Sequence, residues 1–208
     1  MDADLTGVSP WSLGLVAALG YALGSIPFGL LLTHWAGAGD IRAIGSGNIG
    51  ATNVLRTGRK SLALATLLLD LAKGAVPAVL GHLWLGPAGA VLGGAGAIIG
   101  HCYPVWLGFR GGKGVATAAG VVLGLTPGLF ALMLGAFVLV VAFTRWVSLG
   151  SIMAACIAPV AAWGSGNSWA GGLYLLIAAL IVWKHRENIG RLVRGEESRI
   201  TFQAKSSS

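Results

Sequence analysis

Long apolar stretches separated by short polar segments make up most of the chain. Runs of about 17 to 25 mostly apolar residues recur, and this is the length that a helix needs to cross the core of a bilayer. Inside lipid every backbone N–H and C=O group must be paired, so such runs indicate helices rather than open strands. The predicted spans are 11–35, 61–85, 88–107, 115–126, 128–144, 147–163 and 169–184.

Two local signals complete this division of the chain. The apolar stretch 115–143 is too long for one crossing, and a Thr-Pro-Gly turn signal at 126–128 lies in its middle. Residues 195–208, which include Glu197, have the polar composition of a disordered tail. The sequence therefore predicts an all-α integral membrane protein with a single domain, 1–208, built as a bundle of about seven transmembrane helices.

Composition and charge support a membrane protein. A hydrophobic content of 55% with only 10% charged residues excludes an ordinary soluble globular protein. The formal net charge of +7 would suggest nucleic acid binding in a soluble chain, but here the positions of the charges matter more. Apart from Lys73, every Lys and Arg lies in the odd-numbered loops or the C-terminal tail. The positive-inside rule therefore predicts cytosolic basic loops, a cytosolic C-terminus and an outside N-terminus, and no nucleic acid partner is expected.

The first candidate for chemistry is the glycine-rich segment 45–53. Gly45 and Gly47 let the backbone turn its N–H groups inward, and Ser46, Asn48 and Thr52 add short side-chain donors. The segment is therefore a candidate cradle for an anion, although a flexible loop would use glycines in the same way.

A helix that begins near Asn48 would align the donors of this segment. Asn48, Thr52 and Arg56 would then lie at i, i+4 and i+8 and would present two neutral donors and one cation to a phosphate. Residues 45–50 also match the pattern Gly-x-Gly-x-x-Gly, but dinucleotide binding requires a preceding strand in a βαβ unit. The preceding run is helical in pattern, so a dinucleotide site is not favoured.

A second glycine-rich segment contains Gly111, Gly112, Lys113 and Gly114. It departs from the Walker pattern at Leu107, where a glycine is needed, and at Gly114, which replaces Ser or Thr, so nucleotide hydrolysis is not expected. A lysine between glycines at the start of a helix can hold a phosphate through backbone donors and its own charge. The alternative is a simple positive-inside anchor, and this segment alone does not decide between the two.

Two later segments add polar groups at predicted helix ends. Ser148 begins a span, where a serine is usually only a cap. His185 and Asn188 lie at i and i+3 and can face the bundle, while Glu187 and Arg191 at i and i+4 predict an exposed ion pair.

Asp70 and Lys73 lie inside the second predicted span at i and i+3. Charges within a membrane favour a functional hypothesis, but this spacing suits mutual neutralisation, so a structural pair is preferred. His101, near the cytosolic end of the third span, is interpreted as a packing residue rather than as support for a site.

The polar groups of four cytosolic segments are thus predicted to meet beneath one membrane bundle. They are Ser46, Arg56, Lys113, Ser148, His185 and Asn188. The set contains no acidic cluster for a metal and favours a phosphorylated ligand, while the spans leave room for an acyl chain. These features favour an enzyme that joins a phosphate ester to a fatty chain. A transporter of phosphate or of a phosphorylated metabolite is the alternative.

The same motifs resemble one family, the bacterial membrane acyl-phosphate-dependent glycerol-3-phosphate acyltransferases. The resemblance extends over nearly the whole chain through the segments 45–53, 68–74, 100–117, 145–149 and 185–191. It implies transfer of a fatty acyl group from acyl phosphate to the 1-hydroxyl of sn-glycerol 3-phosphate, which gives lysophosphatidic acid and phosphate in the first acylation of phospholipid synthesis.

The resemblance also implies a setting for this reaction. It predicts a multi-pass protein of the bacterial inner membrane with its active site on the cytosolic side and with membrane lipid around it. No cofactor and no metal are expected. A soluble enzyme that produces acyl phosphate is an expected partner.

By resemblance, two groups of residues would hold the two substrates. The acyl phosphate site would comprise Gly45, Ser46, Gly47, Asn48, Thr52, Gly111, Gly112 and Gly114. The glycerol 3-phosphate site would comprise Arg56, Lys113, Ser148, His185 and Asn188. Ser46, His185 and Asn188 are the candidate catalytic residues. The hydroxyl proton would pass to His185 or to the departing phosphate, and direct attack is preferred because no base adjacent in sequence would activate Ser46 as a nucleophile.

Overall fold

A computed structural model describes residues 9–200, and all regular secondary structure in this range is helical. The predicted tail residues 201–208 lie outside the described residues. The α-helices are α1 (Pro10–Gly24), α2 (Phe28–Trp35), α3 (Ala51–Leu55), α4 (Lys60–Cys102), α5 (Val115–Leu125), α6 (Pro127–Thr144), α7 (Val147–Gly164), α8 (Ser168–Lys184) and α9 (Arg186–Val193). Two short 3-10 helices, η1 (Ile41–Ala43) and η2 (Val105–Leu107), lie in the connections.

The long helix α4 doubles back on itself and contains two predicted spans, 61–85 and 88–107. Its backbone leaves helical geometry at Leu85 and at Gly86, where φ is 61°, a value that only glycine adopts readily. Beyond this turn the two arms pack closely, because Gly81 and Gly89 each lie against the backbone of the other. The predicted turn between these spans is therefore confirmed.

The break predicted in the stretch 115–143 is also present. α5 ends at Leu125 and α6 begins at Pro127, whose missing N–H suits the first position of a helix. Near the N-terminus, Pro27 separates α1 from α2 within the predicted span 11–35.

The number of membrane-length helices differs from the sequence prediction. Four helical segments of the described residues are long and apolar enough to cross a membrane, namely Pro10–Trp35, Lys60–Leu107, Pro127–Thr144 and Val147–Gly164. The pair α8 and α9, bent by 59°, makes a fifth if it is counted as one span. The all-α membrane architecture is confirmed, whereas a count of seven is not established because α5 is short and α4 is one continuous segment by this criterion.

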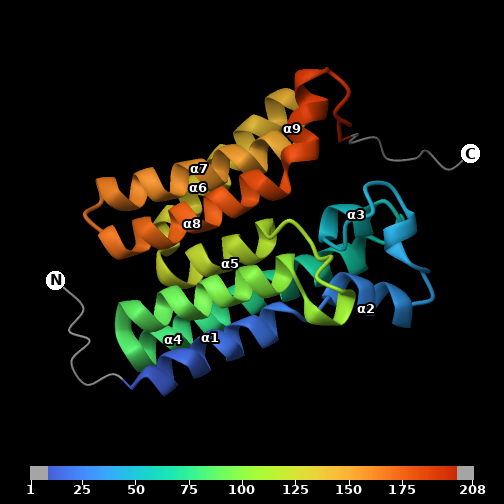
Figure 1. Cartoon of the computed structure of the whole chain (residues 1–208). Helices are drawn as coiled ribbons and strands as arrows, with labels where there is room; N and C mark the ends of the chain where they lie inside the picture. The colour runs from blue at the N-terminus through green and yellow to red at the C-terminus, as the bar shows by residue number, and fades with distance from the viewer. Residues whose placement is uncertain (1–8, 201–208) are drawn as a thin grey trace, which may run out of the picture.

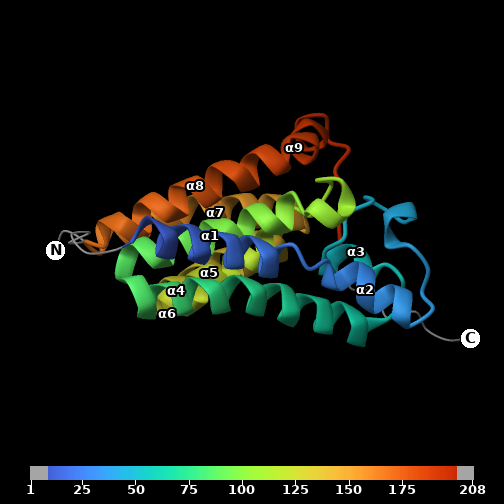
Figure 2. The ribbon, with the colours of Figure 1, turned by 60° about the horizontal axis from the view of Figure 1, so that its bottom comes forward.

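The helices form two groups that meet along the length of the molecule (Figure 1). α4 packs against α1 and α5, and α7 packs against α6 and α8. Figure 2, turned from the first view, shows α2, α3 and α9 gathered at the end of the bundle opposite the start of α1. The first and last described residues therefore lie at opposite ends of the bundle.

The close contact between α1 and α4 depends on glycine. A Cβ atom at Gly20 would overlap the backbone of Gly93, whereas Gly14 on the same helix has open space around it. We expect Gly20→Ala to lower the free energy of unfolding by about 1 to 3 kcal/mol, the usual cost of overpacking. Thermal or denaturant unfolding in detergent micelles would measure this. Gly14→Ala is the matched control, and equal effects of the two substitutions would contradict the packing.

Candidate functional site

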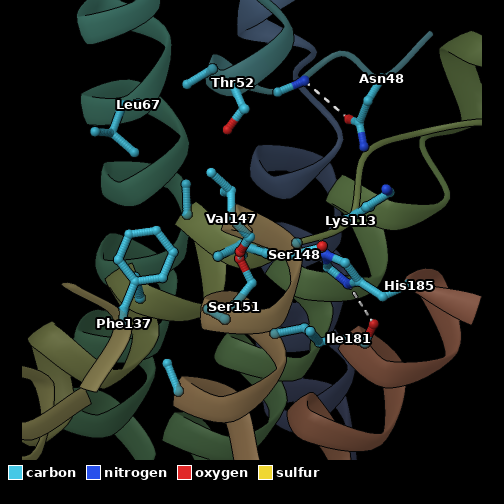
Figure 3. Close-up of a pocket in the computed structure, with 18 of the residues that line it drawn as sticks. Asn48, Thr52, Leu67, Lys113, Phe137, Val147, Ser148, Ser151, Ile181 and His185 are labelled. Atoms are coloured by element: carbon cyan, nitrogen blue, oxygen red, sulfur yellow. Dashed lines mark hydrogen bonds between the residues drawn. The ribbon is translucent and has the colours of Figure 1, made fainter. Parts of the chain in front are cut away.

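A cavity of about 740 Å³ lies where the polar connections meet the bundle. Its walls come from α3, α4, α6, α7, the start of α5, and the junction of α8 with α9. It brings together nine of the predicted site residues: Ser46, Asn48, Thr52, Arg56, Lys113, Gly114, Ser148, His185 and Asn188. Figure 3 shows three of them, Lys113 from the connection before α5, Ser148 from the start of α7 and His185 from the bend between α8 and α9, and all three line the cavity.

Four predicted glycines shape the loops and do not line the cavity: Gly45, Gly47, Gly111 and Gly112. The N–H groups of Gly111 and Gly112 donate to the carbonyls of Cys102 (3.2 Å) and His101 (3.0 Å). These two N–H groups are occupied by carbonyls at the end of α4, so in this structure they are not free to donate to a phosphate.

The helix after the first glycine-rich segment, α3, begins at Ala51, so Asn48 does not share a helix with Thr52 and Arg56. The Asn48 side chain accepts a hydrogen bond from the Gly50 N–H (3.1 Å), a local bond that competes with helix formation. Thr52 and Arg56 remain one turn apart, and all three predicted donors still line the cavity.

Asn53 is a support of this segment that sequence reasoning missed. Its side chain is buried, donates to the carbonyl of Ile41 (2.7 Å) and accepts from the Ser46 N–H (3.3 Å). Asn53 thereby ties the Ser46 turn to η1 and fixes the loop at the cavity.

His185 occupies the bend between α8 and α9 and is buried. Its Nδ1 lies 2.8 Å from the carbonyl oxygen of Ile181, which can only accept a hydrogen bond (Figure 3). The Nδ1 proton is therefore committed to Ile181, and in the neutral ring Nε2 carries a free lone pair.

Burial lowers the pKa of His185 to about 4, because the charged imidazolium loses its hydration. The hydrogen bond to Ile181 opposes this shift, and the positive charge of Lys113 adds to it. At neutral pH His185 is therefore an uncharged ring whose Nε2 is able to accept a proton.

We expect the His185 ring to stay neutral from pH 8 down to about pH 5. The folded-state pKa lies below that of a free histidine, so protonation requires more acid than usual. NMR titration of the imidazole signals in detergent-solubilised protein would test this, with the resonance assigned through His185→Gln. A midpoint near the unperturbed value of about 6.5 would contradict it.

Lys113 and Asn188 contact each other at the polar end of the cavity. The Lys113 ammonium donates to Asn188 Oδ1. Burial, followed by the nearby charge of Arg191, lowers the pKa of Lys113. The lysine is thus held by a neutral amide in a partly desolvated position, where a cation attracts an anion strongly.

Glu197 enters the same polar end and corrects two predictions. Its carboxylate accepts hydrogen bonds from Ser148 Oγ (2.7 Å), Asn188 Nδ2 (2.6 Å) and Arg191 Nε (2.7 Å). Glu197 is buried and held in place, unlike the disordered tail predicted for 195–208. Arg191 pairs with Glu197 instead of the predicted Glu187. The 59° bend between α8 and α9 makes this pairing possible, because it turns Arg191 toward the returning chain.

The Glu197 carboxylate remains ionised at neutral pH. Burial by itself raises the pKa of this group, but the hydrogen bonds from Asn188, Ser148 and Arg191 outweigh burial and leave the pKa below its usual value. The Glu197 carboxylate, which accepts three hydrogen bonds, therefore occupies the part of the cavity that was predicted to bind an anion.

Two buried polar residues of α4, Asp70 and His101, also line the cavity. Asp70 Oδ1 lies 2.8 Å from Lys73 Nζ, which confirms the predicted ion pair, and Lys73 also donates to the carbonyl of Ile26 (2.8 Å). His101 Nδ1 lies 3.1 Å from Thr117 Oγ1, and its ring lies directly beneath Gly112. His101 therefore supports the loop that carries Lys113, beyond the packing role predicted for it. Within residues 9–200 no three His, Cys, Asp or Glu side chains cluster as metal ligands.

The other end of the cavity is apolar. Leu67 and Leu68 of α4 and Leu134 and Phe137 of α6 line it. In Figure 3, Leu67 and Phe137 lie on the side of the cavity away from Lys113 and His185. Leu68 is 56% exposed and Leu134 is 47% exposed. Because these leucines both line the cavity and are exposed, we infer that the cavity opens sideways between α4 and α6.

The fold and the cavity together define a class: an all-α protein with membrane-length helices whose cavity joins a cationic, hydrogen-bonding end to an apolar end. Residues 14–195 match the family model described as glycerol-3-phosphate acyltransferase. The chain belongs to this glycerol-3-phosphate acyltransferase family, which confirms the resemblance found in its motifs.

Relatives and solved structures agree with this assignment. The chain is 52% identical over 188 residues to the glycerol-3-phosphate acyltransferase of Methylorubrum extorquens (strain PA1), covering 89% of this chain and 93% of the relative. It is 53% identical over 196 residues to that of Agrobacterium fabrum (strain C58 / ATCC 33970), covering 92% and 94%.

The fold is also similar to that of PlsY (YgiH), an integral membrane glycerol 3-phosphate acyltransferase. Its glycerol 3-phosphate form superposes with a TM-score of 0.88 at 37% identity and covers 92% of this chain and 100% of that chain. A lysophosphatidic acid form of PlsY superposes with a TM-score of 0.86, also at 37% identity, and covers 91% and 96%.

Proposed function

We propose that this chain transfers a fatty acyl group from acyl phosphate to the 1-hydroxyl of sn-glycerol 3-phosphate. The products are 1-acyl-glycerol 3-phosphate, that is lysophosphatidic acid, and inorganic phosphate, in the first acylation step of phospholipid synthesis. The observation that carries this proposal is the cavity itself, which has the half-buried Lys113 and its hydrogen-bonding neighbours at one end and a lateral apolar opening at the other. A water-soluble anion and a fatty chain would thus occupy different ends of one cavity.

We assign the two substrates to two sets of residues in and around the cavity. The glycerol 3-phosphate site comprises Arg56, Lys113, Ser148, His185 and Asn188, which line the polar end. The acyl phosphate site comprises Ser46, Asn48, Thr52 and Gly114, which lie in the same cavity, while Gly45, Gly47, Gly111 and Gly112 shape the loops around it. Arg191, one turn beyond Asn188, adds a cation to the cavity, whereas the sequence predicted an exposed ion pair with Glu187 for it.

The chemistry follows from two anions that repel each other. An acyl phosphate is already activated, so the protein mainly has to hold the hydroxyl oxygen in line with the carbonyl carbon. Arg56 and Lys113 offset the repulsion between the two phosphates, and donors such as Ser46 stabilise the oxyanion. The hydroxyl oxygen attacks the acyl carbon, the bond to phosphate breaks, and the hydroxyl proton passes to His185 Nε2 or to the departing phosphate.

This mechanism needs no covalent intermediate on Ser46. The Ser46 N–H bonds Asn53, and within the described residues no hydrogen bond joins the Ser46 hydroxyl to a base. Direct attack is therefore the proposed route.

The proposed setting is the bacterial inner membrane with the cavity facing the cytosol. We count seven crossings when the two arms of α4 and the short α5 are each taken as a span, which leaves the N-terminus outside and the C-terminus in the cytosol. Membrane lipid surrounds the bundle, and a soluble enzyme that makes acyl phosphate would supply the donor.

Cysteine labelling in sealed vesicles tests this sidedness. Arg110→Cys and Arg194→Cys should react from the cytosolic side, and Ser165→Cys, in the connection between α7 and α8, from the opposite side. All three positions are exposed, and the exposed native Cys156 is first replaced. Reaction of Arg110→Cys and Arg194→Cys from different sides would contradict a single cytosolic site.

The function is tested with purified protein in detergent. Synthetic acyl phosphate is supplied with and without glycerol 3-phosphate, and both phosphate release and lysophosphatidate formation are measured. We expect release that depends on glycerol 3-phosphate and equals the lysophosphatidate formed, and no reaction with an acyl thioester. Uptake of phosphate or glycerol phosphate into liposomes without chemistry would instead indicate a transporter.

A further inference from the structure

The last described residues cross the polar end of the cavity. Glu197, Ser198, Arg199 and Ile200 all line it. We call residues 196–200 the C-terminal strap. The Ile200 N–H donates to the carbonyl of Arg145 (2.9 Å), so the end of the strap is tied to the connection between α6 and α7.

Further contacts hold the strap in place along its length. Trp146 Nε1 donates to the backbone carbonyl of Glu197 (3.2 Å), and the Arg199 guanidinium lies 5.3 Å from the centre of the Trp146 ring. Arg56 Nη2 donates to Ser198 Oγ (3.3 Å). Arg56 is thus engaged by the strap although it is also assigned to the glycerol 3-phosphate site.

Within the strap, Glu197 makes the contacts that a bound anion would make. Its carboxylate takes hydrogen bonds from Ser148, Asn188 and Arg191, and Lys113 lies next in this network through Asn188. Lys113, Ser148 and Asn188 are assigned above to the glycerol 3-phosphate site, and Arg191 lines the same cavity. A carboxylate and a phosphate both present negatively charged acceptor oxygens, and two such groups cannot fill the same donors together.

We propose that the C-terminal strap is an internal competitor of the substrate, with the Glu197 carboxylate in the position of the substrate phosphate, and that it must leave before glycerol 3-phosphate binds. This inference rests on the proposed function of the cavity. The strap has no helix of its own and lies beyond residues 14–195, the part of the chain that matches the family model. Its release therefore leaves the helices that build the cavity intact.

The consequence for affinity is quantitative. Glycerol 3-phosphate binds only to the fraction of molecules in which the strap has left the cavity. Its apparent dissociation constant therefore equals the intrinsic dissociation constant divided by that fraction. Substrate and strap then exclude each other, so a weaker strap raises the apparent affinity for glycerol 3-phosphate. The maximal rate stays the same, because saturating substrate displaces the strap completely.

Glu197→Gln in the full chain tests this competition. The amide keeps the size of the side chain but removes its charge, so we expect the KM for glycerol 3-phosphate to fall about tenfold, the effect of about one charge-assisted hydrogen bond, with kcat unchanged. Glu196→Gln is the matched control, since Glu196 is exposed and pairs only with Arg194 within the described residues. A lower kcat would instead make the carboxylate part of the catalytic site, and an unchanged KM would overturn the competition.

A second measurement follows the strap directly and needs no acyl donor. Arg199 is exposed, but its neighbour Ile200 is tied to Arg145, and we expect this tie to slow cleavage of the strap by trypsin. We expect saturating glycerol 3-phosphate to speed cleavage after Arg199 several-fold in the full-length protein, detected by intact mass, whereas glycerol has no effect. In Glu197→Gln, cleavage should already be fast.

The two measurements separate the strap from the proposed function. If no variant forms lysophosphatidate but glycerol 3-phosphate still speeds cleavage after Arg199, the reaction is wrong and the competition stands. If turnover is normal but cleavage after Arg199 does not respond to glycerol 3-phosphate, the strap does not compete and the reaction stands.

Discussion

Replacing His185 with alanine is expected to lower kcat by about a hundredfold or more, the usual contribution of a general base. The imidazole is neutral, its Nδ1 proton is held by Ile181, and its Nε2 is free to accept the hydroxyl proton. The measurement is the steady-state rate of lysophosphatidate formation with both substrates saturating, so that weaker binding does not contribute to the loss.

Two further variants test whether a loss of activity in His185→Ala comes from the missing basic nitrogen. His185→Asn retains an N–H that can bond the Ile181 carbonyl but has no basic nitrogen, so it should be as slow as the alanine variant. His82→Ala is the matched control, because His82 stacks on Trp169 away from the cavity. Near-normal turnover in His185→Ala and His185→Asn would leave the departing phosphate as the proton acceptor.

Replacing Lys113 with alanine is expected to raise the KM for glycerol 3-phosphate and to lower kcat/KM by about a hundredfold. Lys113 is partly desolvated, and in the proposed complex its ammonium pairs with the phosphate of the substrate. Removing one partner of such a charge pair typically weakens binding by about 2 to 5 kcal/mol. Each 1.4 kcal/mol corresponds to a factor of about ten in affinity. Initial rates at varied glycerol 3-phosphate and saturating acyl phosphate would measure this.

The neighbouring Arg110 supplies the control for Lys113. Arg110 is exposed, lies in the same connection and does not line the cavity, so Arg110→Ala should leave the KM unchanged. Lys113→Arg should recover only part of the loss, because the larger planar group fits a site built for an ammonium poorly. An unchanged KM in Lys113→Ala would remove Lys113 from the glycerol 3-phosphate site.

Much of the fold could be predicted because its signals are local. Apolar runs gave the helices, and the turns at Gly86 and at Pro127 were marked by residues whose backbone preferences break a helix. The number of crossings was harder to predict, since α5 is only 11 residues long and hydropathy does not say whether a short apolar helix spans the membrane.

The site was predicted less completely than the fold. Placing the basic loops on one side of the membrane was enough to predict that Lys113, His185 and Asn188 would meet, and they do. The contacts of Glu197 depend on the bend between α8 and α9 and on the path of the chain afterwards, which no local pattern indicates. The start of α3 could not be fixed from the sequence, because local side-chain contacts such as the hydrogen bond from the Gly50 N–H to Asn48 compete with the helix there.

The sideways opening between Leu68 and Leu134 has a consequence for product release. A fatty chain that left this protein through water would have to expose each CH₂ group at about 0.8 kcal/mol, or more than about 10 kcal/mol for a chain of fourteen carbons. Sliding directly from the apolar cavity into the leaflet avoids this barrier, since one hydrocarbon environment replaces another. Turnover in a bilayer would then be nearly independent of how insoluble the product is.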